Sequence, residues 1–267
     1  MHYDCFSNMK KNCRNIKTKN PVLLLFFVAC SFLFCTCGLE EYYVLEAPFR
    51  TYHEPNAETE FAGRYFDFET NEAANAVHTS FDFLGTAVYY KIYNDLALLT
   101  SRASTLNADN NSTTYGTAAT RLINTYGYQQ LGTDSGSRSP LIEAASPPTD
   151  RRIYIRLSNY QTDSSYQSKV IVGYNGTDPS VPGTYMPRRS ILKGGGHCTF
   201  DFGRTEIYDD VPSSGNEDYN HTESGSPTTF YVDLYAVSVG RDTTYTMYYS
   251  KVLHLGVVKI DAAEADN

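Results

Sequence analysis

The chain has 267 residues, with 22 basic and 30 acidic side chains, six cysteines and 23 tyrosines but no tryptophan. A net charge of −8, with no basic cluster after residue 36 larger than Arg151-Arg152 or Arg188-Arg189, argues against binding to the phosphate backbone of nucleic acid. The length suits one large domain or two small ones.

Residues 1–36 are predicted to be an export signal. Five basic side chains precede Pro21 to Phe34 (PVLLLFFVACSFLF), which carries no charge. At about 1.5 Å per helical residue this run is about 21 Å long, which is short of a hydrocarbon core of about 30 Å. An uncleaved anchor helix is the alternative, since Cys35 to Leu39 lengthen the run. Either Met1 or Met9 fits as the start.

The end of the apolar run has the pattern of a lipid attachment site. It reads Leu33-Phe34-Cys35-Thr36-Cys37, and the acidic chain begins at once with Glu40 and Glu41. This resembles the loose lipobox of spirochaete lipoproteins, in which an apolar residue and a small residue precede the cysteine. The resemblance implies cleavage before Cys37, a diacylglycerol on its thiol and an acyl chain such as palmitate on its amine. The chain would then be anchored to a membrane through lipid.

Cys30 is a rival attachment site, because Phe27-Val28-Ala29 precede it. Its use would leave the apolar residues up to Phe34 exposed beside the lipid, so Cys37 is preferred. Removing residues 1–36 takes away five basic residues and one acidic residue, which leaves 17 against 29 and a net charge of −12. With Cys37 acylated, Cys198 stands alone, so packing must hold residues 37–267 together without an internal disulfide.

The composition of residues 37–267 predicts a mainly β fold, organised as a single domain. Short apolar runs with strand-like alternation are separated by Gly, Pro, Asn, Asp and Ser. The clearest runs are Glu41 to Glu46, Arg64 to Glu69, Thr86 to Tyr93, Arg152 to Leu157, Ser168 to Tyr174, Cys198 to Phe202, Phe230 to Val239 and Lys251 to Ile260. This many strands with loops of uneven length indicate a β-sandwich.

Several runs resemble strands of fibronectin type III or immunoglobulin-like sandwiches. Phe230 to Gly240 (FYVDLYAVSVG) resembles the F strand, and Lys251 to Ile260 would follow it as the G strand. Leu84 to Ile92 (LGTAVYYKI) resembles the C strand, Tyr43 to Pro48 the A strand and Arg64 to Glu69 the B strand. The chain departs from the family in lacking the B-strand Trp and in the roughly 140 residues between the C-like and F-like strands. With its loose lipobox and its Tyr-rich strands, the chain is also similar to lipoproteins of treponemes.

The long insertion, residues 94–150, is predicted to carry two short helices. Asn94 to Asn107 has Asp95 near its start and leucines at helical spacing, and Thr114 to Leu131 repeats the pattern. We expect these helices to cover one end or edge of the sandwich. Gly132 to Asp150 has the composition of a linker, and Val211 to Thr229 that of a long mobile loop.

No stretch specifies a reaction, and the chain is predicted not to be an enzyme. Lys193 to Cys198 (KGGGHC) places a His beside a Cys, but neighbouring residues of a strand point to opposite faces. A glycine-rich strand entry is the favoured interpretation. There is no Gly-x-Ser-x-Gly motif from which a serine nucleophile could be argued.

Metals and other cofactors find equally little support. Thr205 to Thr222 is rich in carboxylates, with Glu206, Asp209, Asp210, Glu217, Asp218 and His221, yet it lacks the order of a calcium loop. A solvated acidic loop is favoured. Asn107 to Asn111 has the first spacings of such a loop without its downstream Glu, and the histidines form no i, i+4 pair for zinc.

Surface chemistry points to binding. Tyr, Ser, Gly and Asn dominate loop-based binding sites on sandwiches, and this chain is rich in all four. Thr243 to Tyr249 (TTYTMYY) and Tyr160 to Tyr166 (YQTDSSY) are the first candidates for a binding edge, although such tyrosines equally coat sheet faces. The sequence thus predicts an exported lipoprotein of the cell envelope that binds a protein or glycan ligand. The alternative is a periplasmic structural or assembly lipoprotein without an external ligand.

Overall fold

The computed structural model describes residues 43–76, 81–112, 114–134, 140–159, 166–177, 185–193, 196–203, 210–222 and 227–262. The chain divides into two units, Met1–Tyr42 and Tyr43–Asn267, and all described residues belong to the second. The predicted signal peptide, residues 1–36, and Cys37 therefore lie outside the described residues, as does Cys30.

The described part is mainly β, as the composition predicted, and most of its strands pair antiparallel. The first sheet has the order β1-β2-β7-β8, with β1 Arg50–His53, β2 Phe66–Glu69, β7 Arg152–Arg156 and β8 Lys169–Val172. The second sheet has the order β12-β3-β13-β14, with β12 Tyr219–Asn220, β3 Phe81–Tyr93, β13 Thr229–Asp242 and β14 Met247–Asp261. Two small sheets pair β5 (Gly132–Thr133) with β9 (Pro187–Arg188) and β10 (Leu192–Lys193) with β11 (Gly196–His197).

Three short strands share the outer edge of β3. β6 (Ile142–Glu143), β4 (Gln129–Gln130) and β12 pair with it one after another. Gly85 makes the first of these pairings possible, because a Cβ at its φ of +134° would lie 2.1 Å from the Ile142 carbonyl oxygen. The edge is thereby covered by the chain itself.

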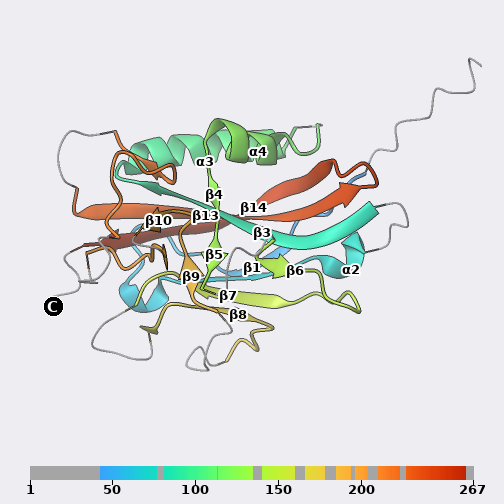
Figure 1. Ribbon diagram of the computed structural model, residues 1–267, viewed down its shortest axis with the longest axis horizontal. Helices are drawn as coiled ribbons and strands as arrows, with labels where there is room; N and C mark the ends of the chain where they lie inside the picture. Colours follow the sequence, from blue (N-terminus) through green and yellow to red (C-terminus); the bar gives the residue numbers. More distant parts are fainter. Residues whose placement is uncertain are drawn as a thin grey trace, which may run out of the picture. The chain divides into compact units, whose positions relative to one another are not determined.

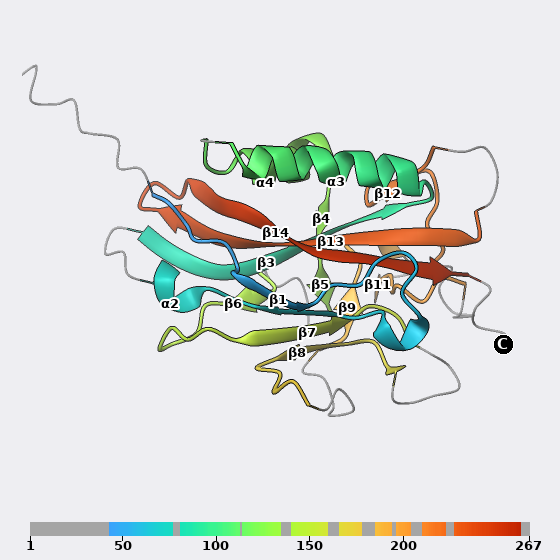
Figure 2. The same ribbon diagram turned by 180° about the vertical axis from the view of Figure 1, so that it is seen from behind.

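The two sheets enclose one core, and the helices enclose another. Alternate residues of β3 point to opposite faces: Val88, Tyr90 and Ile92 enter the core between the sheets, whereas Tyr89 and Tyr93 enter the core beneath the helices. Figures 1 and 2 show the helices on one side of the second sheet and the first sheet on its other side. The helices therefore cover a sheet face, and the expectation that they cap an end or edge was wrong, because β3 and β13 are apolar on both faces.

The first predicted helix is confirmed as α3, Leu96–Asn110. The Asp95 carboxylate caps it by accepting the amide hydrogens of Ala97 at 2.8 Å and Leu98 at 3.1 Å. The second predicted helix is shorter than expected: α4 spans Thr117–Thr120 and continues as one π-helical turn, Arg121–Thr125. Gly127, at φ +64°, ends it in the left-handed conformation common after helices.

Other elements were predicted less well. The described part of Glu41 to Glu46 forms no strand, and neither does Cys198 to Phe202. The segment Gly132 to Asp150 is not a plain linker, since it contains β5 and β6 and buries Leu141 and Ile142. In the same way, Val211 to Thr229 holds β12 and the fully buried Asp218. Both segments carry side chains whose partners lie far away in the sequence. Four-residue helix α2, Glu72–Asn75, and the 3-10 turn Phe61–Gly63 complete the described elements.

The strand order differs from that of the immunoglobulin constant-type sandwich. In that fold one sheet has the order A-B-E-D, so strand E pairs with B, and strand D, which precedes E in the chain, lies outside E. Here β2 pairs with β7, and β8, which follows β7 in the chain, lies outside it. The order β3-β13-β14 in the second sheet does correspond to C-F-G.

Candidate functional site

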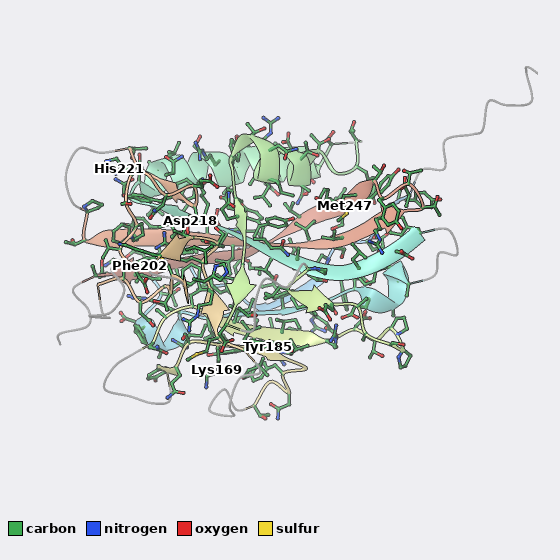
Figure 3. The ribbon with its side chains drawn as sticks, in the orientation of Figure 1. Lys169, Tyr185, Phe202, Asp218, His221 and Met247 are labelled. Carbon is green, nitrogen blue, oxygen red and sulfur yellow. The ribbon has the colours of Figure 1, made fainter. Side chains whose placement is uncertain are left out.

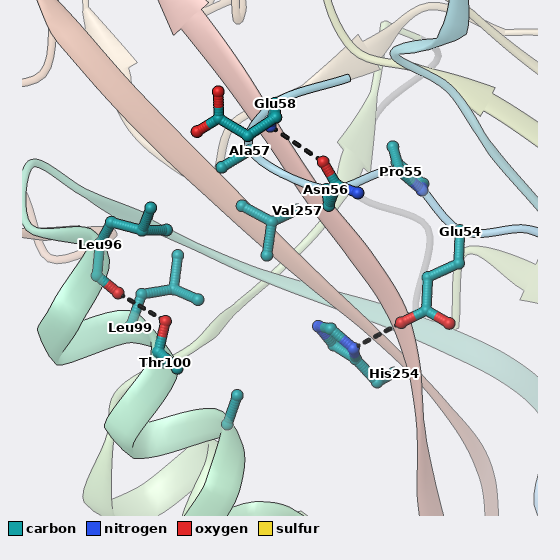
Figure 4. Close-up of a pocket in the computed structure, with 11 residues that line it drawn as sticks. Glu54, Pro55, Asn56, Ala57, Glu58, Leu96, Leu99, Thr100, His254 and Val257 are labelled. Carbon is teal, nitrogen blue, oxygen red and sulfur yellow. Dashed lines mark hydrogen bonds and ion pairs between the residues drawn. The ribbon is translucent and has the colours of Figure 1, made fainter.

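The candidate site is a groove between α3, β14 and the loop that follows β1 (Figure 4). Its main part has a volume of about 590 Å³ and is lined by Glu54, Pro55, Asn56, Ala57, Glu58, Leu96, Leu99, Thr100, Ala103, His254 and Val257. A second hollow of about 400 Å³ shares Glu54, Ala103 and His254 with the first. The two together form one groove along α3; the walls of its main part are mostly apolar, with the carboxylates of Glu54 and Glu58 among them, and the second hollow is more polar.

Local backbone features place the walls of the groove. The Asp95 cap fixes where α3 begins, and Leu99, which is buried, holds the helix against the second sheet. On the other side, Gly256 in β14 has a φ of +115°, and the carbonyl oxygen of Pro55 lies 2.4 Å from where its Cβ would be. Because only glycine allows that approach, the Pro55 carbonyl can accept the Val257 amide hydrogen at 2.9 Å. The β1 loop is thus attached to β14.

His254 lies in the groove between two carboxylates. Its Nδ1 hydrogen bonds to Glu54 Oε1 at 2.9 Å and its Nε2 to Asp233 Oδ1 at 2.8 Å. Burial by itself would lower the pKa of His254, but the hydrogen bonds to Asp233 and Glu54 outweigh it and raise that pKa to about 10. The hydrogen bond from His254 lowers the pKa of Glu54. At neutral pH the ring is therefore a cation that donates through both nitrogens.

Behind His254 a chain of hydrogen bonds runs into the core beneath the helices. Tyr128 donates to Asp233 Oδ2 at 2.6 Å, and Tyr93 donates to Tyr128 at 3.1 Å. Burial, together with the Asp233 charge, raises the pKa of Tyr128 well above its usual value, and burial raises the pKa of Tyr93 to about 12. Asp233 itself is fully buried, so these partners and His254 replace the water that its charge would otherwise need.

This arrangement is suited to holding a ligand. A charged imidazole with both N–H groups engaged has no lone pair with which to remove a proton, so His254 is not a general base at neutral pH. The groove instead offers apolar contact along α3 and Val257, beside the half-exposed carboxylate of Glu54. A ligand with an apolar part and a hydrogen-bond donor would match both features.

The Gly-His-Cys motif does not contribute to the groove. Cys198 is buried, and burial raises the pKa of its thiol. The His197 ring donates from Nδ1 to the backbone carbonyl of Arg189 at 3.1 Å. Both groups belong to the packing around Arg189, while Gly194 and Gly195 lie outside the described residues.

The acidic stretch Thr205 to Thr222 proves to be partly interior, so the prediction of a solvated loop was wrong for its two buried carboxylates. Asp218 is fully buried. Its carboxylate accepts hydrogen bonds from Nε of Arg189 at 2.7 Å and from a terminal guanidinium nitrogen of Arg189 at 2.8 Å. Tyr90 also donates to Asp218, at 2.7 Å. The buried Asp210 carboxylate accepts the amide hydrogen of Thr199 at 3.0 Å. Glu206 and Asp209 lie outside the described residues.

Within the described part of the chain, no three His, Cys, Asp or Glu side chains gather as a metal-binding group. The arginine pairs noted in the sequence are largely engaged in ion pairs: Arg151 with Glu72, Arg152 with Asp67 and Arg189 with Asp218. These arginines hold loops to strands, which leaves little of their charge for a polyanion.

The two Tyr-rich stretches have different outcomes. Thr243 to Tyr249 forms the tip of the β13–β14 hairpin, where Tyr245 is 74% exposed. Of Tyr160 to Tyr166, only Tyr166 is described, and its ring packs edge-on against Phe61 at 5.9 Å between centroids. Many other tyrosines, such as Tyr90, Tyr93 and Tyr128, fill the two cores.

Sequence reasoning missed the groove. His254 stands in an alternating strand and is separated from Glu54 by 200 positions, so no spacing links them. The available signal was a histidine and a buried acid, Asp233, at interior positions of the F-like and G-like strands. Such polar residues in otherwise apolar strands require partners, which only the folded chain identifies.

No protein-family model, curated protein or solved structure matches this chain. Across the part of the chain that the structure describes, none of the helices combines the length and apolar character needed to span a bilayer.

Proposed function

We propose that this chain is an exported, lipid-anchored bacterial lipoprotein whose folded unit, Tyr43–Asn267, binds a protein or glycan in the α3–β14 groove. The observation that carries the binding function is the groove itself, with apolar walls along α3 and Val257 and the Glu54–His254–Asp233 array at one side. A carboxylate at the mouth accepts hydrogen bonds from hydroxyl, amide or ammonium groups, and the apolar wall takes the hydrocarbon part of the ligand.

The anchor is supported by the N-terminal sequence. Basic residues, an uncharged apolar run and Leu33-Phe34-Cys35-Thr36-Cys37 stand in the order of a lipoprotein signal, and the acidic chain follows directly. Acyl chains on Cys37 would hold the protein at the cell envelope, since two or more chains bind a bilayer firmly. The resemblance of this leader to those of spirochaete lipoproteins supports a spirochaete as the source in this proposal. The net charge of −12 after cleavage is the reason that nucleic acid is not proposed as a partner.

The fold belongs, in this proposal, to the fibronectin type III and immunoglobulin-like sandwiches. Support comes from the C-F-G order of β3, β13 and β14, on which the sequence resemblance also rests. The exchanged order of β7 and β8 would make it a variant of that group.

Blocking the groove tests the binding function. Ala103→Trp places an indole in both hollows, whereas Ser104→Trp places the same group on the neighbouring, exposed position of α3. The native protein is first screened on arrays of surface glycans and of extracellular-protein peptides. For the ligands that it binds, we expect Ala103→Trp to have at least tenfold lower affinity and Ser104→Trp to have the native affinity. Equal binding by both variants would refute the groove as the binding site.

Labelling with radioactive palmitate tests the anchor. The native chain and Cys30→Ala are expected to incorporate label, and Cys37→Ala is expected to lose it. Label that is lost in Cys30→Ala instead would transfer the attachment to Cys30. Protease treatment of intact cells then separates a surface-exposed binding module from a periplasmic structural lipoprotein, because only the former is digested.

A further inference from the structure

The tip of the β13–β14 hairpin is exposed, and its loop residues carry no charge. Its segment Thr243 to Met247 contains no ionisable group other than a tyrosine hydroxyl, and Tyr245 and Met247 are 74% and 42% exposed. The Arg241 guanidinium lies over the Tyr245 ring at 5.1 Å from its centroid. Figure 3 shows Met247 at the end of this hairpin. An aromatic ring and a thioether beside a cation suit the boundary between water and lipid.

The backbone at Tyr245 is unusual. Its φ is +65°, which makes it the one non-glycine residue with positive φ among those the structure describes. Hairpin loops of this kind generally have Gly or Asn at the left-handed position, because a Cβ is strained there. The loop is held by the Asp242 carboxylate, which accepts the amide hydrogens of Thr244 at 2.8 Å and Thr246 at 2.9 Å. A bulky ring at a strained and exposed position indicates a use that the fold does not require.

The hairpin tip lies where the folded unit begins. Tyr43, its first residue, stacks on Phe81 at 4.9 Å and meets Tyr248 edge-on at 5.6 Å, in centroid distances. Phe81 begins β3 and pairs with Asp242 at the end of β13, so the three aromatic residues and the hairpin tip share one end of the sheet. Gly240 makes room for Phe81, since a Cβ there would lie 2.2 Å from the ring.

A lipid on Cys37 would bring this end of the sheet to the membrane. Five residues separate Cys37 from Tyr43, and the six Cα-to-Cα steps between the two span at most about 22 Å when fully extended. That distance is less than the thickness of a bilayer, including its headgroup regions, of about 40 Å. The end of the unit that carries Tyr43 is therefore confined to the vicinity of the lipid surface, whichever way the short connection runs.

We infer that Tyr245 and Met247 form a membrane-contacting surface that inserts into the headgroup region of the bilayer to which Cys37 is anchored. The inference rests on the proposed lipid anchor and adds a second contact with the same membrane. Two contacts at one end of the sheet would set the orientation of the unit, so that the α3–β14 groove remains accessible from the aqueous side.

The absence of tryptophan makes a direct test available. Tyr245→Trp and Met247→Trp each create a single-tryptophan protein. Leu192→Trp is the matched control, since Leu192 is 66% exposed and its strand, β10, lies away from the hairpin tip (Figure 1). The full acylated protein of each variant is purified in detergent and reconstituted into phospholipid vesicles with and without brominated acyl chains. Intact mass of the same samples reports whether Cys37 carries lipid.

The expected result is a shift of emission to shorter wavelength and several-fold stronger quenching by brominated lipid for Tyr245→Trp and Met247→Trp than for Leu192→Trp. Equal, weak quenching of all three in acylated protein overturns the inference and leaves the anchor standing. If the emission of Tyr245→Trp and Met247→Trp changes only when envelope proteins are added, the inference is overturned in favour of a protein partner. Samples without lipid on Cys37 refute the proposed anchor, and the inference with it.

Tyr245→Gly provides a readout that a purely structural role would not give. Relief of the left-handed strain should raise the Tm by roughly 1–4 °C. In Met247→Trp, the added Tyr245→Gly change should nevertheless reduce quenching by brominated lipid. A lowered Tm with unchanged quenching would show that Tyr245 serves the fold alone and would overturn the inference.

Discussion

His254 shows how one residue can depend on distant parts of the chain. Asp233, its partner on the adjacent β13, is fully buried, and Glu54 comes from the loop after β1. A buried carboxylate is tolerated only when its hydrogen-bonding capacity is met, and here Tyr128 and His254 meet it. The ring therefore stabilises the fold and at the same time lines the groove.

Removal of the imidazole should destabilise the protein. His254→Gln leaves Asp233 with a weaker partner and no opposite charge, so we expect a loss of about 2–3 kcal/mol in the free energy of unfolding. His197→Gln is the matched control, since the His197 ring hydrogen bonds to a neutral backbone carbonyl, and this change should cost about 1 kcal/mol or less. Urea unfolding of the three proteins measures both values, and equal losses would contradict a special role for His254.

The raised pKa of His254 predicts a dependence of stability on pH. The pKa of His254 is about 10 in the folded chain and 6.5 in an unfolded chain. Its contribution to the free energy of unfolding is therefore fully present below pH 6.5 and is lost as the pH rises to about 10. The Tm of the native protein should fall between about pH 7 and pH 9, before tyrosines ionise. His254→Gln should show a flatter profile over that interval. Parallel profiles would mean that another group titrates.

At the scale of elements, the segment from Val211 to Thr229 illustrates an interior loop. Its Asp218 and the Arg189 that meets it are both almost wholly buried, and Tyr90 of β3 completes the cluster. Arg189 also donates to the backbone carbonyl of Asp210 at 2.6 Å. One guanidinium thus holds two loop segments against the second sheet, which explains how a stretch with loop composition is ordered around β12.

Breaking this pair should be costly. Arg189→Met leaves the Asp218 charge buried without its cation, so a loss of about 3–5 kcal/mol is expected. The double variant Arg189→Met with Asp218→Asn should lose less than Arg189→Met alone, because the uncompensated charge is gone. Arg241→Met is the control, since its contact with Asp82 is solvent-exposed and should be worth less than about 1 kcal/mol. A double variant that loses as much as Arg189→Met alone, or more, would contradict this expectation.

Element prediction succeeded where the signal is local. Strands β3, β13 and β14 follow from runs rich in β-branched and aromatic residues, and the start of α3 follows from Asp95. The short strands β4 and β6 carry no such signal, since two residues cannot show a period. They form because the edge of β3 offers unpaired backbone groups to whatever chain passes it.

At the scale of the whole molecule, Tyr43–Asn267 contains both hydrophobic cores. Its second sheet is shared between them, since it faces the first sheet on one side and α3 and α4 on the other. The described residues of both clusters all belong to this unit. The unit therefore has the contacts needed for independent folding.

A fragment of residues 43–267 is accordingly expected to fold by itself. Its Tm should lie within roughly 3 °C of the Tm of the chain that begins at Cys37, because the fragment keeps every described residue of the two cores. Thermal unfolding followed by circular dichroism compares the two. A fragment without a cooperative transition would show that residues before Tyr43 contribute to the fold.

The sequence by itself determined the β class, the long central strands, the first helix and the hypothesis of a lipid-modified Cys37. These are local properties, since alternation, capping and a lipobox are each contained within a few neighbouring residues. Tertiary structure alone decided that the helices cover a sheet face, that Asp218 is interior and that Glu54, Asp233 and His254 meet beside a groove. Those outcomes depend on which distant side chains can satisfy a buried charge or fill a core, and that is settled only when the sheets pack together.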